Sequence, residues 1–480
     1  MVVAFYEPFA YDINFERCLE IIESHLAKGD SVHFFGCSKS LKACDTNLYH
    51  YSAICNACIK RRKKGLSLLS KTLHYHDLIQ LNNAQKAVVE SFLKGIKLVD
   101  LPSVKAIEFE SFDIGTAVMS SVISHLRTPK PDLQKHRKLI LNFFRAAIEA
   151  YLSMLYHLED KKIELLYAYN GRFAPMRASI RAAEKLNVNY FTHEIGIDLQ
   201  KYIVYPNALP HSIKTNQDMI KTYWEATEPQ LREANGKAFY QGQEGGTLMG
   251  GHYDFTKNHQ KGLLPSNWDT SKHNIAIFNS SEDEFASIGK EWQGGVYNSQ
   301  FEGISKIAEA LKSNLDIHIY LRMHPNLMNA SQSIVKQFDG LNSRNFTIIA
   351  PASSISTYSL LNAAKKVITF SSSVGIEAAY RQKPTIILGR CFYQNLGSTY
   401  HPQNHQETLN LLLDKSLPAK PITGALMYGH FRYSYGIPYQ HYKADTVLKG
   451  RFKNQYIDLP LWQQKWVLLF KKIQKLKKTI

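Results

Sequence analysis

The sequence lacks a continuous apolar run of about 18 residues, so it predicts no transmembrane helix. Its first residues, MVVAFYEPFAYD, contain no basic stretch and no long apolar core, and Glu7 and Asp12 occur early. These absences argue against a signal peptide. The chain also shows no internal repeat and no low-complexity tract. We therefore expect a folded cytoplasmic protein.

Acidic residues are fewer than basic ones. The chain has 41 Asp and Glu against 58 Lys and Arg, which gives a formal net charge of +17. A basic excess favours an anionic partner, which could be a nucleic acid, an acidic membrane surface or a phosphorylated substrate. Charge alone leaves these three classes open.

Cysteine is sparse, but four of the six cysteines lie close together. Cys37, Cys44, Cys55 and Cys58 fall within 22 residues, and IKRRKK follows them. A cytoplasmic protein rarely keeps a disulfide framework. A cluster that includes one C-x-x-C pair fits a tetrahedral structural zinc site. The alternatives are buried unpaired thiols or an isolated disulfide.

Strands and helices alternate in two series. The first begins with VVAFY, an amphipathic helix and SVHFFG, which is a βαβ opening typical of parallel sheets. A glycine-rich stretch from about 234 to 272 resembles an interdomain connection or a long functional loop, and a second series follows it. We predict an acceptor-side domain over 1–265, a nucleotide-sugar-binding domain over 270–420 and a C-terminal extension over 421–480.

The strongest chemical pattern is VITFSSSVGIEAAY, residues 367–380. An apolar strand leads into Ser371, Ser372 and Ser373, and a helix is predicted to begin at once. Free backbone N–H groups and serine hydroxyls at such a point suit a phosphate, and Gly375 would permit its close approach. Glu377 could accept hydrogen bonds from a ribose diol. Simple helix capping by serine is the alternative.

Two further strand ends carry polar residues. LDIHIYLRMHPN places Arg322 and His324 at the end of a strand, and NIAIFNSS does the same for Ser280 and Ser281. Ligands of open α/β sheets bind at the carboxyl ends of the strands. Arginine can bind a phosphate bidentately and histidine can donate to one. A structural loop histidine and an acidic helix-capping turn are the alternatives.

The order R-x-H-P, S-S-S-x-G-x-E-A and K-P-x-I-x-L-G resembles the C-terminal domain of GT-B glycosyltransferases of the capsule and surface-polysaccharide group. That group includes enzymes using CMP-activated Kdo, and bacterial sialyltransferases share the His-Pro and serine motifs. The resemblance covers about residues 274–400 and implies that His324 and Ser371–Ser373 hold the nucleotide phosphate. Glycerol-phosphate polymerases that use CDP-glycerol carry similar motifs, so the donor stays open.

The resemblance also implies a base in the N-terminal domain that takes the acceptor proton. Glu194, in FTHEIGID, is the first candidate, and His193 beside it is the second. Arg172, in NGR, could pair with Glu194 or with the donor. A surface loop position is the alternative for Glu194, and Asp45, Asp198 and Asp283 compete with it as the base. No cofactor is expected for the chemistry itself.

The C-terminus, LPLWQQKWVLLFKKIQKLKKTI, predicts an amphipathic basic helix. From Tyr442 onward there are ten Lys or Arg against two Asp, so nearly half of the net charge lies there. Tryptophan and leucine at helical spacing beside lysine suit an anionic membrane surface, which would hold the protein peripherally at the inner face of the membrane. A helix packed on its domain with a solvated basic face is the alternative.

Together these patterns predict an α/β protein with two Rossmann-like domains facing across a cleft, the GT-B architecture, followed by the basic helix. The function they favour is sugar transfer from a nucleotide-activated donor, with a CMP-sugar favoured, to a surface polysaccharide or lipid-linked glycan. A nucleotide-sugar epimerase or a CDP-glycerol-type phosphotransferase is the alternative enzyme. A nucleic-acid-binding protein is the non-enzyme alternative, but no nucleic-acid module is visible and we expect no nucleic-acid partner.

Overall fold

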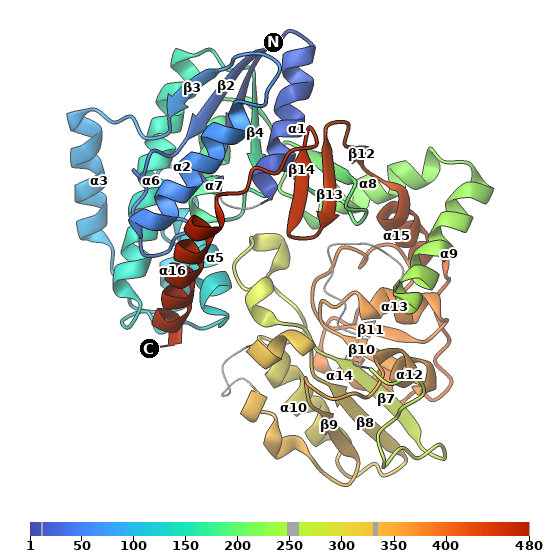
Figure 1. Ribbon diagram of the computed structural model, residues 1–480. Helices are drawn as coiled ribbons and strands as arrows, with labels where there is room; N and C mark the ends of the chain where they lie inside the picture. The colour runs from blue at the N-terminus through green and yellow to red at the C-terminus, as the bar shows by residue number, and fades with distance from the viewer. Residues whose placement is uncertain (11–12, 247–258, 330–334, 480) are drawn as a thin grey trace. The chain divides into compact units, whose positions relative to one another are not determined.

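The computed structural model describes residues 1–10, 13–246, 259–329 and 335–479 (Figure 1). The chain forms two compact units. Unit 1 contains Met1–His211 and Gly436–Ile480, and unit 2 contains Ser212–Tyr435. These bounds differ from the predicted division at 265/270 and 420/421, because the chain enters unit 2 earlier and returns to unit 1 at its C-terminal end.

Unit 1 is built on a seven-stranded sheet in the order β12-β6-β5-β4-β1-β2-β3. Strands β1 to β5 run parallel, whereas β6 pairs antiparallel with β5 and β12 antiparallel with β6. The strands are β1 Val2–Tyr6, β2 Ser31–Gly36, β3 His74–Asp77, β4 Leu165–Tyr169, β5 Asn189–Ile195, β6 Lys201–Pro206 and β12 Ile437–Pro438. A separate hairpin, β13 Tyr442–Thr446 and β14 Lys449–Phe452, completes the strands of this unit.

The helices of unit 1 include one that is unusually apolar. α6 is long and apolar enough to cross a membrane by length and composition, which the sequence patterns did not predict, but most of its apolar stretch is buried. It packs against α5 and α7, as a core helix does. The helices are α1 Asn14–Ala27, α2 Ser52–Leu66, α3 Asn83–Gly95, α4 Leu101–Lys105, α5 Ile114–Leu126, α6 Arg137–Asp160, α7 Ala174–Lys185 and α16 Leu461–Thr479.

Unit 2 is built on a five-stranded parallel sheet in the order β11-β10-β7-β8-β9. Its strands are β7 His273–Phe278, β8 Ile317–Arg322, β9 Phe346–Ile349, β10 Lys366–Thr369 and β11 Thr385–Ile387. Alternate residues of β7 enter different cores, Ile275 and Ile277 on one face and Ala276 and Phe278 on the other. Apolar cores on both faces explain why these strands are continuous apolar runs.

Two helices of unit 2, α8 and α9, precede its first strand, and the others lie between or after its strands. The α-helices are α8 Ile213–Glu225, α9 Pro229–Gly245, α10 Gln300–Leu311, α12 Thr357–Ala363, α13 Val374–Tyr380, α14 His405–Leu413 and α15 Thr423–Ser434. Short 3-10 helices are η1 Glu282–Glu284, η2 Lys290–Trp292, η3 Pro325–Asn329 and η4 Asp339–Leu341.

The glycine-rich segment predicted as a connection is partly helical. α9 extends through it to Gly245, and residues 247–258 lie outside the described residues. A Cβ on Gly236 would come within 2.8 Å of the Leu426 carbonyl oxygen in α15, and one on Gly429 within 2.7 Å of the Gly236 carbonyl oxygen. These glycines therefore let α9 and α15 pack closely, and the segment belongs to unit 2.

Both sheets contain the strand order of a Rossmann-like fold. In each, the first strand lies at the centre, the next two extend to one side, and the fourth and fifth lie on the other. The prediction of two Rossmann-like α/β domains is confirmed. The order reverses between β1 and β4 in unit 1 and between β7 and β10 in unit 2, which are the positions where such sheets bind ligands.

Candidate functional site

The loops that follow β7, β8 and β10 lie at the carboxyl edge of the unit 2 sheet. Asn279–Asp283 follows β7, Met323–Pro325 follows β8, and Phe370–Ser373 follows β10. Because β7 lies between β8 and β10, the serine loop and the β7 loop flank the reversal of strand order, and the His324 loop lies next to it. The sheet therefore gathers three of the predicted phosphate-binding segments at one edge.

His324 is held as a neutral hydrogen-bond donor. Its backbone N–H donates to Asn279 Oδ1 at 2.7 Å, and the Asn326 backbone N–H donates to its Nδ1 at 3.2 Å. With Nδ1 accepting, the proton of the neutral ring is on Nε2. Burial lowers the pKa of His324 to about 4, an effect that Asp283 opposes and Arg322 reinforces. At neutral pH the ring can donate from Nε2 to an anionic oxygen without carrying a charge.

The β7 loop presents two buried serines. Gln300, at the start of α10, accepts from the Ser280 backbone N–H at 2.8 Å and donates to its carbonyl at 3.2 Å. Ser281 Oγ donates to Asp283 Oδ1. Ser280 is 5% exposed, and its hydroxyl has no hydrogen-bond partner among the residues that the structure describes. A ligand oxygen could supply the missing partner, provided that the loop around the hydroxyl moves to let it in.

The serine loop after β10 is more open. Ser371 and Ser372 are half-buried and Ser373 is exposed. Ser372 Oγ accepts from the Val374 N–H at 3.3 Å, whereas Ser373, the residue before α13, makes no capping bond with its side chain. Helix capping by Ser373 is therefore not observed. α13 has only seven residues, so the case for this loop rests on its hydroxyls and position rather than on a helix dipole.

Glu377 lies beside this loop. Tyr358 Oη donates to its Oε2 at 2.9 Å, and Ser373 Oγ donates to its Oε1 at 3.4 Å. Burial raises the pKa of the Glu377 carboxyl, and the Tyr358 hydroxyl and the Arg381 charge oppose this shift. The carboxylate therefore links the serine loop to α12, and its proposed role with a ribose diol stays a prediction.

Two predicted site residues have other roles in the structure. The Arg322 guanidinium donates to the carbonyl oxygens of Ala350 and Ser353, so it fixes the loop after β9 rather than facing a phosphate. A Cβ on Gly375 would come within 2.4 Å of Tyr393 Oη and 2.9 Å of Ile387 Cδ1. Gly375 is therefore required for packing of α13 on the sheet, not for approach of a ligand.

Sequence patterns did not reveal the residues that support the site. Asn279 holds the His324 backbone, Gln300 holds Ser280, and Tyr393 Oη donates to the Ser372 carbonyl oxygen. Asn279 could have been noticed because an amide directly follows a buried strand. Gln300 and Tyr393 lie about 20 residues along the chain from their partners, and no local pattern marks them.

In unit 1, Glu194 and His193 are adjacent in β5 and so point to opposite faces of the sheet. Asn170 Nδ2 donates to Glu194 Oε1, and burial raises the pKa of Glu194 above its usual value. His193 is 2% exposed, and burial lowers its pKa to about 3. Glu194 is thus the better base of the two, since a raised pKa brings a carboxylate closer to neutral pH.

Arg172 does not pair with Glu194. Its guanidinium donates to Ser124 Oγ at 2.6 Å and lies over the Phe173 ring. Asn170, two residues earlier, is the actual partner of Glu194. A further carboxylate, Glu7, follows β1 at the reversal of strand order and is 1% exposed. Glu7 was not considered from the sequence, and it competes with Glu194.

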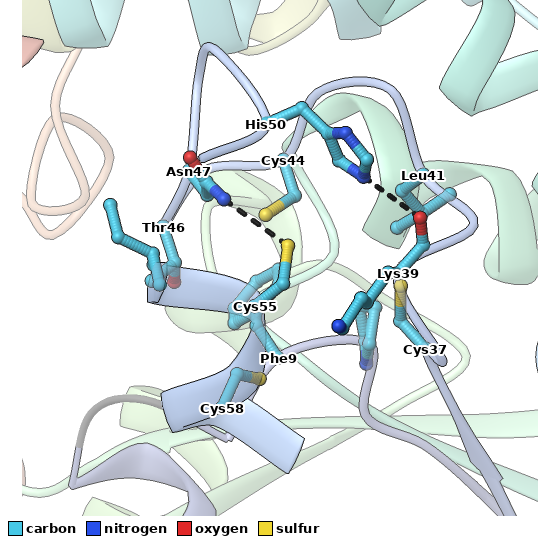
Figure 2. A pocket seen from close by; sticks show the side chains of 12 residues that line it. Phe9, Cys37, Lys39, Leu41, Cys44, Thr46, Asn47, His50, Cys55 and Cys58 are labelled. Carbon is cyan, nitrogen blue, oxygen red and sulfur yellow. Dashed lines mark hydrogen bonds between the residues drawn. The ribbon is translucent and has the colours of Figure 1, made fainter. Parts of the chain in front are cut away.

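The four clustered cysteines line one pocket of unit 1 (Figure 2). The pocket encloses about 20 Å³, and Asn47, His50 and Lys39 also line it. Asn47 Nδ2 donates to Cys55 Sγ at 3.2 Å, and the Ala10 N–H donates to Cys58 Sγ at 3.0 Å. Burial raises the pKa of the Cys58 thiol to about 11. The sequence cluster is therefore also a cluster in space.

All six cysteines are free thiols. Within the described residues, no group of three or more His, Cys, Asp or Glu side chains is arranged to hold a metal ion. Metal binding would thus need the cysteine side chains to turn toward a common point, and zinc stays a prediction.

Residues 292–442 match a protein-family model described as "Capsule polysaccharide biosynthesis protein". The resemblance seen in the motifs is confirmed over this region, which contains His324, Ser371–Ser373 and Glu377. Ser280 and Ser281 lie just before it. No curated protein sequence matches the chain significantly.

Solved structures give weaker likenesses. The Thermosulfurimonas dismutans KpsC β-Kdo 2,4-transferase is 14% identical, with a TM-score of 0.37, over 56% of this chain and 79% of that chain. The Methanocaldococcus jannaschii UDP-GlcNAc 2-epimerase is 13% identical, with a TM-score of 0.30, over 90% of this chain and 98% of that one. Identities and TM-scores this low do not allow an activity to be inferred from either structure.

Proposed function

We propose that the chain is a glycosyltransferase of capsule or surface-polysaccharide biosynthesis. It would move a sugar from a nucleotide-activated donor, with a CMP-sugar favoured, to a growing polysaccharide or a lipid-linked glycan. The observation that supports this most is that Ser280, His324 and the serine loop follow neighbouring strands at the carboxyl edge of the unit 2 sheet, at or next to the reversal of strand order. The family match over 292–442 supports the same interpretation.

These groups suit the departing nucleotide phosphate. Negative charge grows on its oxygens as the glycosidic bond to the sugar breaks, and fixed donors stabilise that charge in the transition state. The Nε2–H of His324 and the hydroxyls of Ser280, Ser371 and Ser372 are such donors, and Ser373 would join them by turning its hydroxyl away from Glu377. Support from Asn279 and Gln300 pre-orients the first two, so little reorganisation is needed when the charge develops.

The acceptor hydroxyl must lose a proton as it attacks the sugar. Glu194 is our candidate for the base, because its carboxylate is partly buried and its pKa is raised. Asn170 and Tyr169 both hydrogen-bond this carboxylate, so the acceptor hydroxyl would take the place of one of these two partners.

A nucleotide panel tests the proposal. The full chain is titrated with CMP, CDP, UDP and GDP, and the shift in unfolding temperature is measured for each. We expect a CMP-containing ligand to give the largest shift. A chain that no nucleotide stabilises contradicts the donor site, and a preference for UDP overturns the CMP assignment alone.

A second measurement separates transfer from the alternative enzymes. With the preferred nucleotide-sugar present, free nucleotide is quantified before and after addition of a glycan acceptor. A transferase releases nucleotide only when the acceptor is added and links the sugar to it. Conversion of the donor sugar without acceptor would instead identify an epimerase, and transfer of glycerol phosphate from CDP-glycerol would identify the phosphotransferase.

A further inference from the structure

The C-terminal helix α16 lies against α2 with one face only (Figure 1). Val467 and Gln474 are buried at 2% and 7% exposure, and Gln474 Oε1 accepts from the Leu48 N–H at 3.1 Å. The Phe470 ring packs against Tyr51 at a centroid distance of 5.3 Å. Val467, Phe470 and Gln474 are three and four residues apart, so they lie on one face of α16, and this face packs against the rest of unit 1.

The opposite face is apolar and exposed. Trp462, Trp466, Leu469, Ile473 and Leu476 recur at the four- and three-residue spacing that keeps side chains on one side of a helix. Trp462 and Leu476 are each 62% exposed, Trp466 57% and Leu469 47%, whereas Ile473 is half-buried. We call these five residues the outer stripe. Phe470 lies on the docked side, where its ring contacts Tyr51.

Lysines border the outer stripe. Lys465, Lys472 and Lys475 are exposed on α16 along one side of it. On the neighbouring α2, Lys60 and Lys63 are also exposed, and Lys60 Nζ lies 6.0 Å from the centre of the Trp462 ring. Lysines of α16 therefore lie along one side of the outer stripe, and a lysine of α2 lies beside its first tryptophan.

We propose that the outer stripe and its lysines form a docking surface for an anionic lipid bilayer. Tryptophan and leucine on one face, with lysine beside them, match the interface between headgroups and acyl chains. Long lysine side chains can reach anionic headgroups while the stripe enters the interface. A protein partner would need its own acidic rim around an apolar groove, whereas an anionic membrane offers both features everywhere. The proposal goes beyond sugar transfer, and its test requires no activity.

The test is co-sedimentation of the full chain with vesicles. Vesicles containing phosphatidylglycerol in phosphatidylcholine are compared with pure phosphatidylcholine at low and at physiological salt. We expect binding to the anionic vesicles that weakens as salt rises, since screening reduces the lysine contribution. A full chain that ignores anionic vesicles at low salt overturns the proposal.

Variants locate the surface. Trp462→Ala with Trp466→Ala should reduce vesicle affinity at least about tenfold, because each exposed ring would otherwise enter the interface. Lys465→Gln with Lys472→Gln should weaken binding at low salt and reduce its salt dependence. Leu448→Ala is the matched control, since Leu448 is 77% exposed in the β13–β14 turn and not on α16.

The substituted side chains are exposed, so the unfolding temperature of each variant should equal that of the wild type. Wild-type vesicle binding by the double tryptophan variant overturns the proposal. So does a dimer of the full chain that the same variant dissociates, because the stripe would then be an interface between two copies.

Discussion

For His324 and Arg322, the sequence predicted the position at a strand end but not the contacts of the side chain. The motif placed His324 at a strand end, and the structure adds the two hydrogen bonds that set its position and tautomer. Arg322, two residues earlier, looked equally suited to a phosphate, but its guanidinium binds carbonyl oxygens of the loop after β9. Strand position was thus predictable, whereas the direction of a long side chain depended on a loop about 30 residues away.

Substitutions at the donor site should weaken nucleotide binding without unfolding the protein. We expect His324→Ala, and separately the triple change of Ser371, Ser372 and Ser373 to Ala, to reduce the binding free energy by about 1.5–3 kcal/mol for each hydrogen bond to the charged phosphate that is removed. Calorimetric titration with the preferred nucleotide measures this. Arg322→Lys is the comparison variant. It should lower the unfolding temperature, because Arg322 holds the loop after β9, and leave nucleotide affinity nearly unchanged. Unchanged affinity in both alanine variants would remove the donor site from this edge.

Glu194 should control the acid side of the pH–rate profile. Burial raises its pKa, so the base becomes protonated, and activity falls, at a higher pH than for an exposed glutamate. Glu194→Gln should lower kcat by about 10²–10⁴-fold while leaving nucleotide affinity unchanged. Glu7→Gln is the competing variant. If Glu7→Gln loses activity and Glu194→Gln keeps it, the base has been misassigned.

The cysteine pocket gives a prediction about metal content. We expect elemental analysis of the purified chain to find about one zinc per molecule, bound by Cys37, Cys44, Cys55 and Cys58. Cys55→Ser should lower both zinc content and unfolding temperature, and Cys391→Ser, at a cysteine of unit 2, should leave the zinc in place. Metal-free protein with full stability would show that these are ordinary buried thiols.

At the scale of elements, pattern revealed β1, β2, β7, β8 and β10 but not the short or outer strands β3, β6 and β12. The strands of unit 2 are apolar runs because both faces of the sheet are buried, and this makes them visible in sequence. The glycines of α9, in contrast, hid a helix from sequence analysis. They suggested a linker, but Gly236 lies in a helix because close packing against α15 stabilises a segment of poor helix propensity. Such packing becomes known only when both helices are placed.

A methyl group where α9 meets α15 should separate the two helices. Gly429→Ala would place Cβ 2.7 Å from the Gly236 carbonyl oxygen and 2.8 Å from Tyr240 Cε2. We expect a decrease of about 1–3 kcal/mol in the free energy of unfolding, the usual effect of overpacking. Chemical denaturation measures it. Gly340→Ala is the control in the same unit, where a Cβ meets nothing within 4 Å.

At the scale of the whole molecule, the sequence predicted two α/β units but not where the chain passes between them. Composition marked a boundary near the glycine-rich stretch, whereas the structural boundary falls at His211 and Ser212, where composition does not change. The return at Gly436 was missed because β12 has only two residues. Membership of a unit is decided by such long-range pairings, and these leave little trace in local sequence.

Buried histidines in both units should make the whole protein less stable in mild acid. Burial lowers the pKa of His193 and His211 to about 3, and of His324, His401 and His430 to about 4. An unfolded histidine has a pKa of about 6.5, so below that pH the unfolded chain binds more protons than the folded one. Stability must then fall as the pH falls from 6.5 toward 4.

The expected size is up to about 2 kcal/mol at pH 5 for a fully buried ring such as His193. Glu194 and Glu377 act in the opposite direction, because their raised pKa values favour the folded state in acid, but they are fewer. Scanning calorimetry between pH 7.5 and 5.0 should therefore show a falling unfolding temperature. His193→Gln should make that fall less steep, since glutamine fills a similar space and takes up no proton. A temperature that stays constant or rises over this range would mean that these rings are solvated in the folded protein.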